Sequence, residues 1–322
     1  MNNANLYNLF LERFPKDPTA LFLDGVDGRR LLYREVPQYT GQMLSLLQQS
    51  GVQKGDRVVV QVEKSIEAVL LYLACLRAGA IYIPLNTAYT PKELGYFLQD
   101  ATPRLFVCAP DRKEALAPVV RAAGVPVVLS LGAGGEGELA EAAATAPASE
   151  QVVEVAADDL AAILYTSGTT GLSKGAMLSH ANLASNAQVL HDYWHWQRDD
   201  VLLHALPIFH VHGLFVALHC ALLGGSRLIF LPRFDADEVI ARLPEATVLM
   251  GVPTFYTRLL ERADFTRELC AGMRLFISGS APLLADTHRE FEARTGHRIL
   301  ERYGMTEAGM ITSNPYDGER IA

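Results

Sequence analysis

Short apolar runs alternate with helix-like stretches in the N-terminal part of the chain, and this alternation limits the possible folds more than any other feature. The strand-like runs fall at 56–62, 80–85 and 104–108, and the helical stretches fall at 65–76 and 91–98. Thr90 precedes the second helical stretch as its expected N-cap. Apolar strands separated by helices form βαβ units with parallel neighbouring strands. The sequence therefore predicts an α/β fold of mostly parallel sheets flanked by helices.

Composition narrows the class of protein. The 322 residues are half hydrophobic, enough for a sizeable buried core, and we expect two subdomains, 1–160 and 161–322. The formal net charge of -8 and the lack of any Lys/Arg run argue against a nucleic-acid partner.

The four cysteines form no CxxC pair, so we expect buried free thiols. Pro207, histidines and glycines interrupt the longest uncharged stretch, 201–226, and no basic, apolar leader begins the chain. These features predict a cytoplasmic protein without a membrane span.

Residues 132–137 read Gly-Ala-Gly-Gly-Glu-Gly and match the dinucleotide pattern GxGxxG after an apolar run. A helix in that motif must pack an apolar face on the sheet, whereas the segment after Gly137 offers only Leu139 and alanines before Pro147. We therefore expect a surface excursion at 132–150. A dinucleotide-binding oxidoreductase stays open as an alternative.

A phosphate-binding loop is the strongest chemical signal. The apolar strand 161–165 runs into Thr-Ser-Gly-Thr-Thr-Gly-Leu-Ser-Lys-Gly at 166–175. Glycines let backbone N–H groups approach a ligand, hydroxyls donate to phosphate oxygens, and the ammonium group of Lys174 adds charge. The spacing G-x-x-G-x-x-K departs from the Walker pattern, so a P-loop NTPase is not indicated. A plain polar turn is the alternative.

Four segments together resemble the adenylate-forming superfamily, which includes acyl-CoA synthetases, luciferases and peptide-synthetase adenylation domains. Residues 165–175 resemble its phosphate loop, and 302–307, Arg-Tyr-Gly-Met-Thr-Glu, resemble its Y-G-x-T-E element. Residues 277–282 resemble its adenine-side strand and turn, and 207–213 resemble its aromatic or histidine gate. The segments occur in the family's order, and the resemblance covers essentially the whole chain. It implies the large N-terminal region of the adenylate-forming fold.

This resemblance implies a two-step reaction in which an acid and ATP form an acyl-adenylate, and the thiol of coenzyme A then displaces AMP. ATP and Mg²⁺ are the implied cofactors and coenzyme A the co-substrate. The implied catalytic residues are Thr166, Lys174, His210, Thr306 and Glu307, with Thr166 and Glu307 as the Mg²⁺ ligands. The implied nucleotide-binding residues are Thr166, Ser167, Gly168, Thr169, Thr170, Gly171, Lys174, Gly279, Ser280, Ala281, Glu301, Arg302, Tyr303, Gly304, Met305 and Thr306.

Other interpretations of these residues remain open. In the alternative interpretation, Tyr303 is a core aromatic residue and does not stack on adenine. His204 and His212 are then interior histidines with satisfied hydrogen bonds. Glu307 is harder to explain without a ligand, because a buried carboxylate amid apolar neighbours needs a partner.

The implied acid is malonate, because 209–214, 251–260 and 275–284 resemble malonyl-CoA synthetases. By that match His210, Arg258 and Ser280 bind the substrate, with Arg258 and Ser280 on its distal carboxylate. A guanidinium group suits a carboxylate, whereas a pocket for a hydrocarbon tail needs no cation. Alternatively, Arg258 lies on the surface of an amphipathic helix at 255–262. Methylmalonate differs by one methyl group, which sequence does not discriminate.

Members of the superfamily continue well beyond residue 322, with a ribose-binding aspartate, a hinge and a small C-terminal lid domain. We therefore expect an N-terminal fragment that lacks the lid and is poorly active alone. A non-catalytic nucleotide-binding fragment is the remaining alternative.

Overall fold

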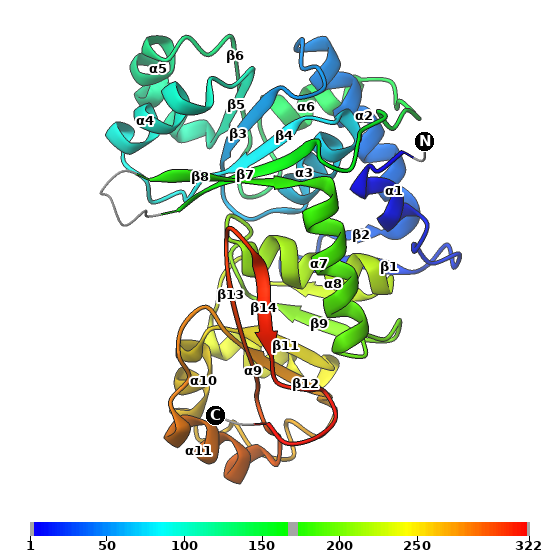
Figure 1. Cartoon of the computed structure of the whole chain (residues 1–322), viewed down its shortest axis with the longest axis vertical. Helices are drawn as coiled ribbons and strands as arrows, with labels where there is room; N and C mark the ends of the chain where they lie inside the picture. The colour runs from blue at the N-terminus through cyan, green and yellow to red at the C-terminus, as the bar shows by residue number, and fades with distance from the viewer. Residues whose placement is uncertain (1–2, 167–172, 321–322) are drawn as a thin grey trace. The chain divides into compact units, whose positions relative to one another are not determined.

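The computed structural model describes residues 3–166 and 173–320, which form two compact units (Figure 1). The first unit comprises Met1–Glu12 and Arg34–Ala184, and the second comprises Arg13–Tyr33 and Ser185–Ala322. Each unit has a sheet flanked by helices, which confirms the predicted α/β class. The subdomain boundary expected between residues 160 and 161 stays a prediction.

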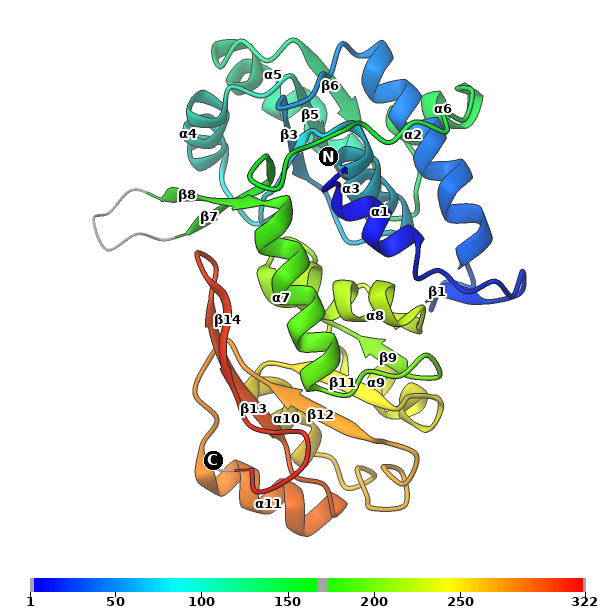
Figure 2. The same cartoon turned by 45° about the vertical axis from the view of Figure 1, so that its right-hand side comes forward.

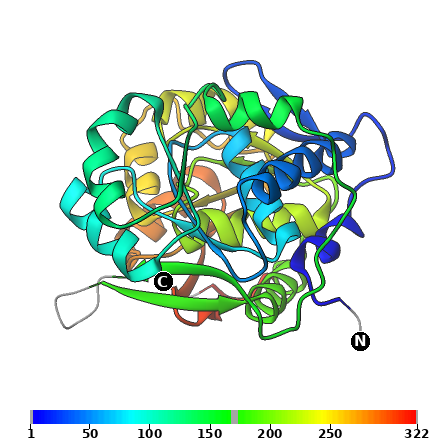
Figure 3. The same ribbon diagram turned by 90° about the horizontal axis from the view of Figure 1, so that it is seen from above.

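A six-stranded sheet in the order β6-β5-β3-β4-β7-β8 forms the centre of the first unit. Its strands are β3 (Arg57–Gln61), β4 (Ile81–Pro84), β5 (Leu105–Cys108), β6 (Val127–Ser130), β7 (Leu160–Thr166) and β8 (Lys174–Ser179). The first five strands in this numbering pair in parallel, and only β8 runs antiparallel, to β7. Figure 3 shows the β7–β8 hairpin, in green, from above. The parallel βαβ pattern predicted for this region is confirmed.

The helices of the first unit are α1 (Leu6–Leu11), α2 (Val36–Gln49), α3 (Ile66–Ala78), α4 (Pro91–Ala101), α5 (Lys113–Ala122) and α6 (Glu138–Thr145), with short 3₁₀ turns at Tyr33–Glu35 and Pro110–Arg112. Thr90 is the N-cap of α4 and forms a capping box with Glu93, as its position predicts. The apolar faces of α4 and α5 meet β3, β4 and β5 in a core that includes Ile83, Phe97 and Phe106. Local capping and periodicity therefore predict α3 and α4 correctly.

An eight-stranded sheet in the order β14-β13-β12-β11-β9-β10-β1-β2 forms the centre of the second unit. Its strands are β1 (Leu21–Gly25), β2 (Arg30–Leu32), β9 (Val201–His204), β10 (Arg227–Phe230), β11 (Val248–Gly251), β12 (Leu275–Ser278), β13 (Leu300–Met305) and β14 (Gly309–Ser313). β2 and β14 pair antiparallel to β1 and β13, and the six central strands pair in parallel. Figure 2 shows β13 and β14 as a red hairpin.

The helices of the second unit are α8 (Leu218–Gly224), α9 (Ala236–Arg242), α10 (Pro253–Leu260) and α11 (Ala285–Thr295), with a π-helical segment at His212–Ala217 and a 3₁₀ turn at Leu243–Glu245. The boundary between the units falls within α7 (His180–Tyr193). Tyr256, Phe265, Phe276 and Phe291 pack together in the core. All four cysteines are buried free thiols, as expected.

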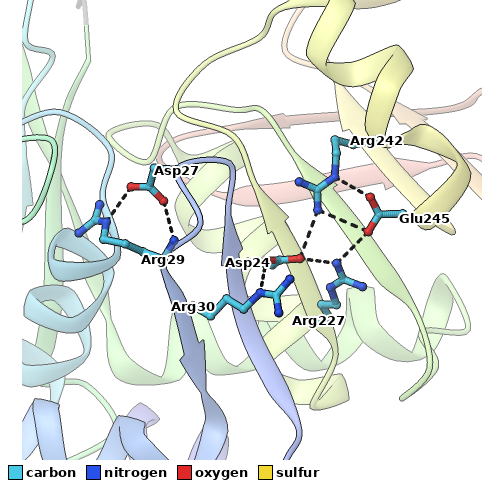
Figure 4. A network of polar contacts seen from close by, with 7 residues as sticks. All are labelled: Asp24, Asp27, Arg29, Arg30, Arg227, Arg242 and Glu245. Atoms are coloured by element: carbon cyan, nitrogen blue, oxygen red, sulfur yellow. Dashed lines mark hydrogen bonds and ion pairs between the residues drawn. The ribbon is translucent and has the colours of Figure 1, made fainter.

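A buried ion cluster ties the β1–β2 hairpin to the rest of the second unit (Figure 4). The carboxylate of Asp24 on β1 is 3% exposed and accepts from Arg30, Arg227 and Arg242. Glu245 accepts from Arg227 and Arg242 at 3.0 and 2.7 Å. The cluster therefore joins residues that are more than 200 positions apart.

Along the residues that the structure describes, no helix combines the length and the apolar composition needed to cross a bilayer.

Candidate active site

The two flanks of the predicted phosphate loop face each other at the loop end of the β7–β8 hairpin in the first unit. Thr166 ends β7, Lys174 begins β8, and the two residues are paired in the register. Lys174 is exposed. Cross-strand partners lie on one face of a sheet, so a hydroxyl and an ammonium group flank the loop together. The other predicted loop residues, Ser167, Gly168, Thr169, Thr170 and Gly171, lie outside the described residues.

In the second unit, predicted site residues gather beyond the carboxyl ends of parallel strands. β9 ends at His204, β11 at Gly251 and β12 at Ser278. Ligands of open α/β sheets bind at such carboxyl edges. Ser280, two residues beyond β12, has a φ of 72°, a left-handed conformation that is uncommon without glycine. Strain of this kind concentrates at functional sites, and it aims the seryl hydroxyl to within 3.3 Å of Nδ1 of His212.

Arg302 on β13 is a buried cation without an anionic partner among the residues that the structure describes. It is 4% exposed, and neither its Nε nor its Nη2 has a hydrogen-bond partner there. Burial lowers the pKa of its guanidinium group to about 10, so the group is still charged at neutral pH. A charge in this setting costs several kcal/mol unless a ligand pairs with it. This environment favours an anionic ligand.

Gly279, one of the predicted nucleotide-binding residues, provides the space for that guanidinium group. A Cβ at this position would lie 2.5 Å from Cζ of Arg302, far closer than van der Waals contact. Ala281, by contrast, is exposed at the turn that follows. A side chain at position 279 would therefore displace the guanidinium group of Arg302.

The two histidines of the predicted gate at 207–213, His210 and His212, and the nearby His204 lie in three different environments. His204 is buried and its Nε2 lies 2.9 Å from the carbonyl oxygen of Gly213, which fits an interior histidine with a satisfied hydrogen bond. His210 is exposed. His212 is buried and begins the π-helical segment, and its Nε2 has no hydrogen-bond partner among the described residues. Burial, reinforced by the charge of Arg302, holds the pKa of His212 well below its usual value, so it is neutral at pH 7. Of these three, His212 is the one in contact with Ser280.

Arg258 lies on an exposed face of α10, in line with the helix-surface interpretation of its position. Its Cζ stands 4.8 Å from the ring centroid of Phe234, which stacks on Phe255 at 4.0 Å. Its distal-carboxylate role stays a prediction. For Arg302, by contrast, the sequence motif predicts a nucleotide-binding role but does not indicate that the side chain is buried without an anionic partner among the described residues. The alternation of Arg302 with Tyr303 along β13 is the pattern that could have indicated it, because alternate residues of a strand face opposite sides.

The β13–β14 hairpin presents the rest of the motif. Tyr303 is 59% exposed, so it is not a core aromatic residue. Gly304 and Thr306 are partly exposed, and Met305 and Glu307 are exposed. Because Glu307 is not buried, the burial argument for its magnesium role does not apply, and that role rests on the resemblance alone. Glu301 accepts from the backbone N–H of Leu283 at 3.1 Å and thereby holds the turn that contains Ser280.

The glycine-rich stretch 132–137 does not have the geometry of a dinucleotide site. The α6 helix that follows buries only Leu139 and Ala143. The backbone N–H of Glu138 donates to Oγ of Ser130, and its carboxylate accepts from the backbone N–H of Ser130 and pairs with Lys113. The first backbone N–H of α6, which a pyrophosphate would approach, therefore already has a hydrogen-bond partner within the protein.

A family model described as "AMP-binding enzyme" matches residues 10–321. The chain belongs to this family. Among solved structures, this AMP-binding family member resembles ATP-bound MatB from Rhodopseudomonas palustris, with 54% sequence identity and a TM-score of 0.96 over 99% of this chain and 63% of that chain. It also resembles a malonyl-CoA ligase solved with methylmalonyl-CoA and AMP, with 33% identity and a TM-score of 0.81 over 97% of this chain and 64% of that one. The predicted adenylate-forming fold is confirmed.

Among curated relatives, this AMP-binding family member is 37% identical over 284 residues to the mitochondrial malonate–CoA ligase of Mus musculus. That alignment covers 83% of this chain and 48% of the mouse protein. The chain therefore spans about half the length of the curated relatives it matches.

Proposed function

We propose that the protein activates malonate as malonyl-adenylate at the expense of ATP, and transfers the malonyl group to coenzyme A with release of AMP and pyrophosphate. The observation that carries this proposal is the buried guanidinium group of Arg302, which has no anionic partner among the described residues and lies beside Gly279 and His212. A monocarboxylic acid would offer it no charge beyond the reacting carboxylate. A dicarboxylic acid supplies a second one, which a guanidinium group binds through its planar fork.

Arg302 and Ser280 form the proposed subsite for the distal carboxylate. The seryl hydroxyl adds a neutral donor, and neutral His212 leaves the charge of Arg302 without a competing cation. Arg258, from the exposed side of α10, is proposed as a second and weaker contributor, because solvent screens an exposed cation.

The names of the relatives support the same acid. The mouse and Arabidopsis thaliana proteins are named malonate–CoA ligases, and the MatB structure is bound to ATP. Methylmalonate is the second candidate substrate, because the related malonyl-CoA ligase was solved with methylmalonyl-CoA. One methyl group changes binding by only about 1–3 kcal/mol, so both acids can be substrates of one site.

The remaining roles are proposed from the family resemblance. Thr166 and Glu307 are the proposed Mg²⁺ ligands, Lys174 contacts the phosphates, Thr306 the α-phosphate, and Tyr303 the adenine. Magnesium bound through nucleotide phosphates needs few protein oxygens, and the hydroxyl of Thr166 and the carboxylate of Glu307 can both supply oxygen ligands. A cytoplasmic location also remains part of the proposal, although the mouse relative is named as mitochondrial.

Calorimetric titration tests this function at two levels. We expect Mg-ATP to bind and NAD not to bind, and Lys174→Ala to weaken ATP by the roughly 1.5–3 kcal/mol typical of a charge-assisted hydrogen bond. With a non-hydrolysable ATP analogue bound, malonate should bind more tightly than butyrate. NAD binding without ATP binding would overturn the nucleotide assignment, and equal affinity for malonate and butyrate would overturn the acid assignment.

A further inference from the structure

Helix α4 contacts both flanks of the phosphate loop through tyrosine hydroxyls. Tyr96 on α4 donates its hydroxyl to the carbonyl oxygen of Ser173, the residue directly before Lys174, at 2.7 Å. On the other flank Tyr165, directly before Thr166, donates its hydroxyl to the carboxylate of Asp100 on α4 at 2.6 Å. One turn of one helix therefore holds the backbone of β8 and the side chain of β7.

Aromatic packing supports the same contact. The rings of Phe97 and Tyr165 lie 4.5 Å apart, and those of Tyr96 and Tyr165 lie 6.5 Å apart in an edge-on arrangement. Burial and the adjacent Asp100 carboxylate raise the pKa of Tyr165 above its usual value. Its hydroxyl therefore stays protonated, as a donor must.

The helix that makes these contacts is itself firmly anchored. The capping box of Thr90 and Glu93 closes its N-terminus. Leu94, Phe97 and Leu98 bury its inner face in the core of the first unit. A helix fixed at its first turn and along one face is a rigid support, and rigid supports hold functional groups in place better than loops do.

The geometry points to α4 as the element that positions the nucleotide-binding groups, with Tyr96 and Tyr165 as positioning residues. Tyr96 sets the backbone next to Lys174, and Tyr165 sets the strand end next to Thr166. This inference rests on the proposed function, in which Lys174 contacts ATP phosphates and Thr166 contacts magnesium. Neither tyrosine has to touch the nucleotide, because each acts on the residue beside it.

Tyr96→Phe tests the inference, since it removes only the hydroxyl. Tyr89→Phe is the matched control, because the Tyr89 ring also packs on Phe97, at 4.9 Å, while none of the hydrogen bonds among the described residues uses its hydroxyl. Losing one hydrogen bond that positions the phosphate-binding residue Lys174 should weaken Mg-ATP binding about two- to tenfold. Binding of malonate and the thermal midpoint should match those of the control.

Tyr165→Phe should weaken Mg-ATP binding by a similar factor, and the double variant should combine the two losses. Hydrogen exchange gives a readout that does not depend on ATP: the amides of 163–166 and 174–176 should exchange faster in Tyr96→Phe than in Tyr89→Phe. If wild-type protein fails to bind ATP, the proposed function fails, yet the exchange result still decides the positioning role. Unchanged ATP affinity, or unchanged exchange at both strand ends, would overturn the inference.

Discussion

Arg302 and Arg258 carry the same charge in opposite surroundings. The first is buried beside Gly279 with two nitrogens unpartnered among the described residues, and the second is exposed over the ring of Phe234. Water stabilises the exposed cation, whereas the buried one has no anionic partner among the described residues and is free to pair with an anionic ligand. The two arginines should therefore differ in what their removal does to binding and to stability.

Arg302→Leu should weaken malonate binding by about 3–5 kcal/mol, the cost of removing one partner from a buried charge pair, and should leave butyrate binding nearly unchanged. The same change should stabilise the ligand-free protein, by about 1–4 kcal/mol, because leucine carries no buried charge. Calorimetry with the ATP analogue bound and urea unfolding measure the two effects.

Arg258→Leu is the exposed counterpart in that experiment. Arg258→Leu should weaken malonate binding by less than Arg302→Leu does. It should change the free energy of unfolding only by the roughly 0.5–1 kcal/mol of an exposed cation–π contact. An equal loss of malonate and butyrate binding in Arg302→Leu would mean that Arg302 is structural, and the malonate proposal would lose its main support.

At the scale of elements, the stability of the β1–β2 hairpin depends on the ionised carboxylate of Asp24. The hairpin lies at an edge of the eight-stranded sheet, where β1 pairs in parallel with β10. Burial alone would raise the pKa of Asp24, yet the hydrogen bonds and charges of Arg227 and Arg30 lower it overall. The ionised carboxylate is thus the form that the folded hairpin stabilises.

Asp24→Asn should destabilise the protein by about 3 kcal/mol, because it leaves three arginines without their shared buried carboxylate. Asp27→Asn is the control within the same hairpin, since Asp27 pairs with Arg29 at the surface (Figure 4) and should cost less than about 1 kcal/mol. Urea unfolding measures both. Equal midpoints for the two variants would show that the cluster contributes nothing specific.

At the scale of the whole molecule, buried neutral histidines link stability to pH. His180, His212 and His219 are at most 5% exposed. Burial lowers the pKa of His180 to about 4 and that of His219 to about 3, and it lowers the pKa of His212 well below its usual value. As pH falls below about 6.5, the unfolded chain binds protons that the folded chain does not, so the free energy of unfolding must decrease.

Each of these histidines should lower the free energy of unfolding by up to about 1.4 kcal/mol per pH unit between pH 6.5 and its folded pKa. His180→Asn removes one of them while keeping an acceptor for the backbone N–H of Leu6, which Nδ1 of His180 accepts at 3.1 Å. Between pH 7.5 and 4.5, the free energy of unfolding measured with urea should therefore decrease less steeply in the variant than in the wild type. Parallel curves would exclude His180 as a linked group.

Elements predicted from local patterns were confirmed where local forces decide. The strand at 104–108 and the helix after Thr90 appear as β5 and α4, because periodicity and capping act within a few residues. The placement of β1 and β2 in the second unit was not predictable in this way. β1 pairs with β10, which lies about 200 residues further along the chain, and no local pattern specifies such a pairing.

By itself, the sequence determined the α/β class and membership of the AMP-binding family, and it predicted a phosphate loop flanked by Thr166 and Lys174, because periodicity and short motifs are local properties of the chain. Only the tertiary structure decided which arginine is buried without an anionic partner among the described residues. The surroundings of Arg302 come from Gly279 and His212, which lie on other segments, and burial is a property of such distant contacts. A motif can supply a charge, but the cost of leaving that charge unpaired arises only when the chain folds around it.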